Sequence, residues 1–119
     1  MTETKNYDLE ERTAVFGENI IKLCAGIKPS LITGPIIKQL VRSATSIGAN
    51  YMEANGASSK KDFLNKIYIC KKESQETKHW LRMLSVALPE KKDKLRLLWQ
   101  EAQEFSFIFH KIATSTKNK

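Results

Sequence analysis

Glu76 and His79 carry the spacing most suggestive of chemistry in this sequence. A Glu-x-x-His pair on a helix is one half of the metal site found in carboxylate-bridged helical bundles, which needs a second pair and two further carboxylates. The other histidine, His110, has no glutamate at that spacing. The apolar seam of the predicted helix passes through Thr77 and Leu81, so Glu76 and His79 point away from the core. We therefore predict no metal site.

Other catalytic signatures are missing from the sequence. It has no glycine-rich phosphate loop and no Cys-x-x-Cys pair. Cys24 and Cys70 each lie in an apolar helical pattern without a Cys or His at ligand spacing, and we interpret them as small buried apolar residues. Unpaired cysteines are typical of the reducing cytoplasm. The sequence predicts a cytoplasmic protein that is not an enzyme and needs no cofactor.

A polar stripe stands out on an otherwise apolar segment. Arg42, Ser46, Asn50 and Glu53 follow one another at spacings of four, four and three, which places them on one side of a helix. The ends of this stripe are about 16 Å apart at 1.5 Å per residue, so Arg42 cannot reach Glu53 within the helix. Each end must meet a group elsewhere. The stripe then either joins its helix to a neighbouring helix or subunit, or binds a ligand.

The second candidate site is a basic strip. The net charge of +7 is concentrated in the second half, where residues 59–88 hold seven basic against three acidic residues. The strip consists of Lys60, Lys61, Lys71, Lys72, Lys78 and Arg82. Such a strip can bind the phosphates of RNA or DNA without reading their sequence. The alternative is a solvated helix face that keeps the protein soluble.

Four segments with helical periodicity must position these residues. Apolar residues recur at alternating spacings of three and four, as in the third segment at Phe63, Ile67, Cys70, Ser74 and Thr77. The helices are expected at about residues 7–27, 35–54, 60–88 and 90–113, with a frayed tail over 114–119. Short loops between long helices force neighbours to be antiparallel. We predict a single all-α domain, an antiparallel up-down four-helix bundle, with no membrane span.

The predicted helices carry more apolar residues than one core needs. Those off the main seams are Ile69, Trp80, Met83, Ala87, Leu97, Trp99, Phe107 and Ile108. Because exposed apolar patches reduce solubility, these residues predict a homo-oligomer joined through helix faces. The alternative is a small satellite core under the loops.

Three stretches resemble the bacterial 23S rRNA intervening-sequence protein family, also called the S23 or four-helix-bundle protein family. They are residues 33–54 (TGPIIKQLVRSATSIGANYMEA), 59–63 (SKKDF) and 71–82 (KKESQETKHWLR), and the opening Tyr7-Asp8-Leu9 is also similar. The resemblance covers about residues 7–90. It implies a four-helix bundle that assembles into a ring, a pentamer in the family's known form, with no established enzymatic activity.

Two functions remain open from the sequence. The bundle also resembles, at the level of the fold, accessory proteins of diversity-generating retroelements, which are pentamers that bind nucleic acid and a reverse transcriptase. The first hypothesis is a noncatalytic oligomer that binds RNA or DNA through basic helix faces. The second is a scaffold for a protein partner whose identity the sequence does not give.

Overall fold

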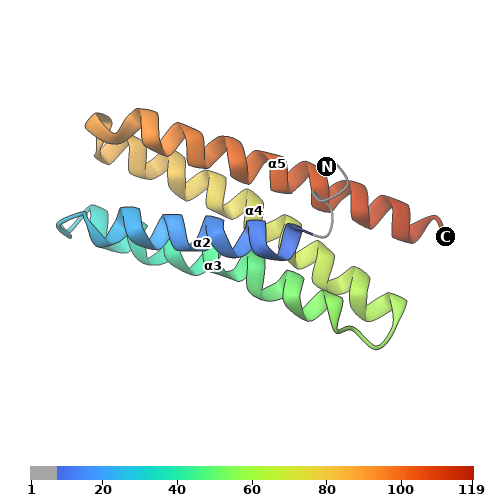
Figure 1. Ribbon diagram of the computed structural model, residues 1–119. Helices are drawn as coiled ribbons and strands as arrows, with labels where there is room; N and C mark the ends of the chain where they lie inside the picture. The colour runs from blue at the N-terminus through green and yellow to red at the C-terminus, as the bar shows by residue number, and fades with distance from the viewer. Residues whose placement is uncertain (1–7) are drawn as a thin grey trace.

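The protein is built from four long α-helices, which the computed structural model describes over residues 8–119 (Figure 1). They are α2 (Leu9–Ala25), α3 (Thr33–Asn55), α4 (Lys60–Ala87) and α5 (Lys92–Lys117), and the one-turn 3₁₀ helix η1 (Pro89–Lys91) joins α4 to α5. No strand occurs within the described residues. The predicted all-α four-helix bundle is confirmed.

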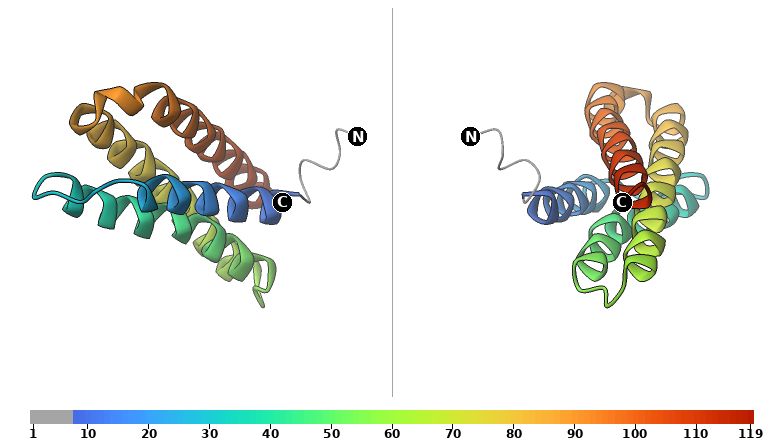
Figure 2. Two further views of the ribbon diagram at one scale, coloured as in Figure 1. Left: turned by 60° about the vertical axis from the view of Figure 1, so that its left-hand side comes forward. Right: turned by 90° about the vertical axis from the view of Figure 1, so that its right-hand side faces the viewer.

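Helix α4 is the centre of the bundle. It packs along α3 on one side and along α5 on the other, whereas α2 packs mainly on α3 and touches α5 only narrowly. Successive helices run in opposite directions, and the α2–α3 loop and η1 lie at the same end of the molecule (Figure 1). Figure 2 shows that the α2–α3 pair and the α4–α5 pair cross at an angle. The bundle is therefore two hairpins joined through the α3–α4 contact.

The core is formed by the predicted apolar seams. Phe105 and Phe109 of α5 are fully buried, and Phe16 of α2 meets Phe105 edge-on with ring centroids 5.4 Å apart. The other buried seam residues include Leu9, Ile20, Leu40, Ile47, Ile67, Leu81, Leu84 and Leu95. None of the helices in residues 8–119 is long and apolar enough to cross a membrane.

Two glycines bring α2 and α3 close together. A Cβ atom on Gly48 of α3 would lie 3.2 Å from Thr13 Oγ1 of α2, and one on Gly17 would lie 3.6 Å from the Thr45 side chain. The first distance is tighter than an ordinary contact, so a side chain at position 48 would require Thr13 to move by a few tenths of an ångström. Gly48 and Gly17 thus allow α2 and α3 to approach closely.

Several predicted helix ends are wrong. The helix expected from Pro35 begins two residues earlier, because the Ser30 hydroxyl accepts a hydrogen bond from the Thr33 amide at 3.0 Å. The expected frayed tail is helical as far as Lys117, since α5 lies beside the start of α4, where Lys60 Nζ donates to the Lys119 carbonyl oxygen at 2.9 Å. Tyr7, the expected start of the first helix, lies outside the described residues.

The surplus apolar surface is smaller than the sequence predicts. Of the eight residues expected off the main seams, only Leu97 and Phe107 are strongly exposed, at 67% and 63%. Trp80, Trp99 and Ile108 are half-buried and pack against the core. The helix ends add Leu31, which is 94% exposed in the α2–α3 loop. The exposed apolar residues are therefore scattered along the helices and loops.

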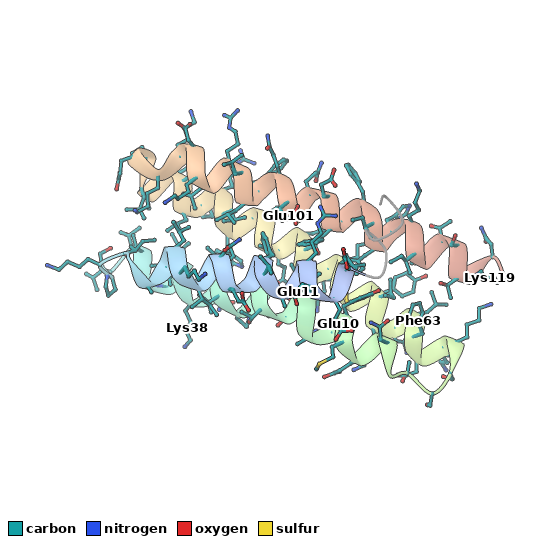
Figure 3. All side chains as sticks on the ribbon, in the orientation of Figure 1. Glu10, Glu11, Lys38, Phe63, Glu101 and Lys119 are labelled. Carbon is teal, nitrogen blue, oxygen red and sulfur yellow. The ribbon has the colours of Figure 1, made fainter. Side chains whose placement is uncertain are left out.

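Arg12 holds α2 onto α5 where the two helices meet. Its guanidinium donates to both carboxylate oxygens of Glu101, at 2.8 Å and 2.7 Å, and to Glu104 at 3.3 Å. Figure 3 shows Glu101 on the side of α5 that faces α2. The guanidinium carbon also lies 5.2 Å from the Phe105 ring centroid. A two-oxygen contact of this kind fixes orientation as well as charge.

Replacing Arg12 tests whether its contacts with Glu101 and Glu104 hold α2 on α5. We expect Arg12→Met, which keeps an apolar stem against Phe105, to lower the free energy of unfolding by about 1–3 kcal/mol in urea titrations. Arg96→Met is the control, because Arg96 is exposed and takes part in no ion pair within residues 8–119. It should change the free energy by about 0.5 kcal/mol or less. Equal stability of the Arg12→Met variant and the wild type would contradict this role of Arg12.

Candidate nucleic-acid interface

The polar stripe of α3 is engaged with α4 at both ends. Arg42 donates to Glu76 at 2.6 Å and to Glu73 at 3.3 Å, and Lys66 donates to Glu53 at 2.7 Å. The pair with Glu53 raises the pKa of Lys66 above its ordinary value.

The middle of the stripe bonds within its own helix. Ser46 donates to the Arg42 carbonyl oxygen at 2.7 Å and Asn50 donates to the Ser46 carbonyl oxygen at 2.8 Å. The stripe residues are thus occupied inside one chain and leave little to hold a ligand.

A buried polar layer lies beneath the Arg42 end. Glu73 is only 6% exposed, and its carboxylate faces Arg42. Thr77 Oγ1 lies 3.0 Å from Ser43 Oγ and 2.7 Å from the Glu73 carbonyl oxygen. Because a buried carboxylate without a partner is strongly unfavourable, Arg42 has to stay at the α3–α4 contact.

The six residues of the predicted basic strip do not stay together. Lys71 and Lys78 turn toward α5, where Lys71 Nζ lies 3.1 Å from His110 Nδ1 and Lys78 bonds to the Gln103 side chain. Lys72 is exposed and lines a shallow depression on α4 together with Lys71, Glu76 and His79. Lys60 and Lys61 are exposed at the start of α4.

Helix α5 supplies the residues that the sequence prediction missed. Lys92, Arg96 and Trp99 meet Arg82 in a cleft of about 420 Å³ next to η1, and Lys78 Nζ lies 5.4 Å from the centroid of the Trp99 indole. The cross-helix pairs Lys71–His110 and Lys78–Gln103 continue the same surface toward the C-terminus. We call this surface the α4–α5 groove, formed by Lys71, Lys78, Arg82, Lys92, Arg96, Trp99, Gln103 and His110. The α5 members recur at helical spacings, a signal the sequence did contain.

The carboxylates nearest the α4–α5 groove lie beside Lys71 and Gln103, and arginines of α2 and α3 engage them. Glu73 and Glu76 of α4 bind Arg42, and Glu101 and Glu104 of α5 bind Arg12. The hydrogen bond from Arg12 to Glu101 raises the pKa of Arg12. None of the ion pairs in residues 8–119 includes a cation of the groove. Its positive charge is therefore not neutralised from within the described chain.

The two thiols have the properties of buried structural groups. Burial raises the pKa of Cys70 to about 12 and raises that of Cys24 as well. Cys70 Sγ donates to the Ile47 carbonyl oxygen at 3.6 Å. A thiol that resists ionisation is a poor nucleophile and a poor metal ligand.

The Glu-x-x-His pair is also accounted for. Glu76 accepts from Arg42, and His79 is exposed with its ring centroid 4.8 Å from that of Trp80. Within residues 8–119, no three His, Cys, Asp or Glu side chains come together as metal ligands would.

Comparison with known proteins now adds to this geometry. The structure defines an all-α four-helix bundle with a basic groove on its α4–α5 hairpin. The model of the family described as "23S rRNA-intervening sequence protein" matches residues 5–111, and the chain belongs to that family. The predicted membership is confirmed, and the match extends beyond the expected residues 7–90 into α5.

A solved structure supports the same assignment. A protein of unknown function from the S23 ribosomal protein family of Bacteroides thetaiotaomicron is 30% identical, with a TM-score of 0.77. The match covers 87% of this chain and 96% of that one. No protein of curated function matches the chain.

The raised pKa of Cys70 predicts a loss of stability in alkali. The unfolded thiol, with an ordinary pKa near 9.0, releases its proton before the folded thiol does at about 12. Unfolding therefore becomes easier as the pH rises through this window, by up to about 1.4 kcal/mol per pH unit. Urea titrations of the wild type and of Cys70→Ala between about pH 8 and 10.5 should show a steeper decline for the wild type. Parallel declines would show that Cys70 does not titrate in this way.

Proposed function

We propose that this protein is a noncatalytic binder of RNA or DNA and that it contacts the phosphate backbone through the α4–α5 groove. The main support for the proposal is that the carboxylates nearest the groove pair with arginines of α2 and α3 and not with the cations of the groove. Arg12 and Arg42 are paired with acids, whereas Lys71, Arg82, Lys92 and Arg96 have no acidic partner within residues 8–119. A row of unpaired cations on one face is the electrostatic pattern of phosphate binding.

The form of the groove supports backbone contact rather than sequence reading. Its cations come from two helices packed lengthwise, and α4 alone is about 42 Å long for its 28 residues. Within residues 8–119 the helices pack lengthwise on their neighbours, which differs from a separate recognition helix that enters a DNA major groove. Binding of this type depends strongly on salt and weakly on sequence. Structured RNA is the first candidate, in keeping with the family's name.

The proposal includes a homo-oligomer, a pentamer by family resemblance, located in the cytoplasm. Leu97 and Phe107, both strongly exposed on α5, are the apolar side chains that such an assembly would cover first. Two free buried thiols support a reducing compartment. A ring would bring several copies of the groove together and strengthen binding through multivalency.

The alternative function is a scaffold for a protein partner, and one observation favours it. Where α2 and α5 diverge, a cleft of about 410 Å³ exposes Leu97 beside the half-buried Leu23 and Leu98, with Lys22 and Lys94 at its edge. An amphipathic helix with acidic flanks fits such a surface.

A salt series tests nucleic-acid binding. Fluorescence anisotropy with labelled duplex RNA and duplex DNA should give affinity that falls steeply as salt rises, by about one log unit of slope per phosphate contact. The variant Lys71→Gln/Arg82→Gln should bind more weakly with both duplexes, and its slope should fall by about two units.

Lys28→Gln/Lys38→Gln is the matched control. It removes the same charge from exposed lysines of the α2–α3 hairpin, and Lys38 lies on the edge of the molecule away from α5 (Figure 3). It should bind like the wild type. If neither duplex binds at low salt, the proposal is wrong. If both variants lose the same affinity, the nucleic acid does not bind through the α4–α5 groove.

Light scattering after gel filtration tests the oligomer. At micromolar concentration we expect a mass well above the 13.6 kDa of one chain, about fivefold for a pentamer. Leu97→Ser/Phe107→Ser should lower this mass, because polar groups at those exposed positions weaken an apolar interface. A wild-type mass of one chain at that concentration would contradict the proposal.

A further inference from the structure

The cleft at the η1 end of the α4–α5 groove differs from the rest of the groove. Arg82, Lys92 and Arg96 contribute three exposed cations to one concave site of about 420 Å³, and Trp99 contributes an aromatic surface. Leu81, Ser85, Leu95 and Gln100 complete its lining, which contains no carboxylate. This volume lies in the range of sites that hold small molecules.

From these residues we infer that the cleft binds the end of a nucleic-acid strand, with its terminal phosphate on the cations and its unpaired last base against Trp99. This inference rests on the proposed function and names the part of the nucleic acid that this end of the groove receives.

The charge of the cleft fits a terminal phosphate better than an internal one. An internal phosphodiester carries one negative charge, whereas a phosphate monoester carries about 1.5 to 2 near neutral pH and offers three acceptor oxygens. Arg82 and Arg96 can each give two parallel hydrogen bonds to such a group, and Lys92 adds a point charge. Three cations at one place exceed what a single diester requires.

The start of α5 adds to the positive potential. Lys92 is the first residue of α5 and its amide donates to the Pro89 carbonyl oxygen, while Lys91 offers no side-chain acceptor to the amides that follow. The N-terminal end of a helix carries partial positive charge. Asp93 lies in the first turn but does not line the cleft.

Trp99 makes the cleft suited to an unpaired base. Its indole is half-buried and packs on the core, so it is held in place, while part of it lines the cleft. Lys78, which lies over the indole at 5.4 Å, does not line the cleft. A base stacked within a duplex cannot reach this ring, whereas an unpaired base can, and stacking of this kind contributes about 1–3 kcal/mol per base.

The position of the cleft explains why a strand would end there. The groove between α4 and α5 closes at Leu88 and η1, where the chain turns from one helix to the other. A backbone that follows the groove from Lys71 and His110 arrives at the cleft with no further surface ahead of it on this hairpin.

The test compares strand ends on the wild-type protein. Single-stranded RNAs of about 12 nucleotides are prepared with a 5′-phosphate, a 3′-phosphate or only hydroxyl ends, together with a duplex of the same sequence. We expect one phosphorylated end to bind about tenfold more tightly than the hydroxyl-ended strand at equal salt. In the Trp80→Phe background, where Trp99 is the remaining tryptophan, this strand should quench the fluorescence and the duplex should not.

Two variants assign the preference to the cleft. Arg96→Gln should bring the ratio between phosphorylated and hydroxyl-ended strands close to one. Trp99→Leu should weaken single strands about tenfold while leaving the duplex unchanged. Lys28→Gln is the control and should leave the ratio as in the wild type.

The outcomes separate the two proposals. Equal affinity for all strand ends, with salt-dependent binding of both strands and duplex, would overturn the terminal-phosphate site and leave the proposed function standing. Failure of every nucleic acid to bind at low salt would overturn both. Because the end preference is measured on the wild type, a variant that fails to fold does not remove the test.

Discussion

Helix α4 has to pack on both of its long sides, and the division of charge between those sides shapes the rest of the molecule. Toward α3 it presents Glu73 and Glu76, which bind Arg42, and toward α5 it presents Lys71 and Lys78. Because the buried Glu73 needs its cation, the α3–α4 contact is fixed in register by charge as well as by apolar packing. The lysines on the other side form no ion pair within residues 8–119 and lie against His110 and Gln103 of α5.

This division connects stability with function in one helix. The acids that would neutralise the basic residues are held by arginines of α2 and α3. The same two hairpins that close the core therefore produce the uneven surface charge. The net charge of +7 shows only that the protein is basic. The ion pairs show on which face the positive charge remains unpaired.

The sequence predicts the fold because the signals that define each helix are local. Alternating spacings of three and four, short loops and Pro89 after the third segment are enough to define four antiparallel helices. The helix ends were less predictable, because Ser30 and the Lys60–Lys119 contact act across positions that periodicity does not describe. For a similar reason, the sequence predicts the α4 part of the candidate site but not the α5 part. Which lysines of α4 bond to α5 depends on how the helices pack, so the periodicity of α4 alone does not bring its Arg82 together with Lys92, Arg96 and Trp99 of α5.

The narrow contact between α2 and α5 has a consequence for motion. Opening this seam exposes much less apolar surface than separating α4 from either neighbour, and its main polar link is Arg12 with two glutamates. We therefore expect its free energy of opening to lie below that of separating α4 from α5, so that α2 amides near the seam exchange with solvent before those between α4 and α5. The α4–α5 hairpin stays closed while the seam opens, since it packs on itself along its length. The bundle can thus open locally between α2 and α5 while the α4–α5 groove keeps its shape.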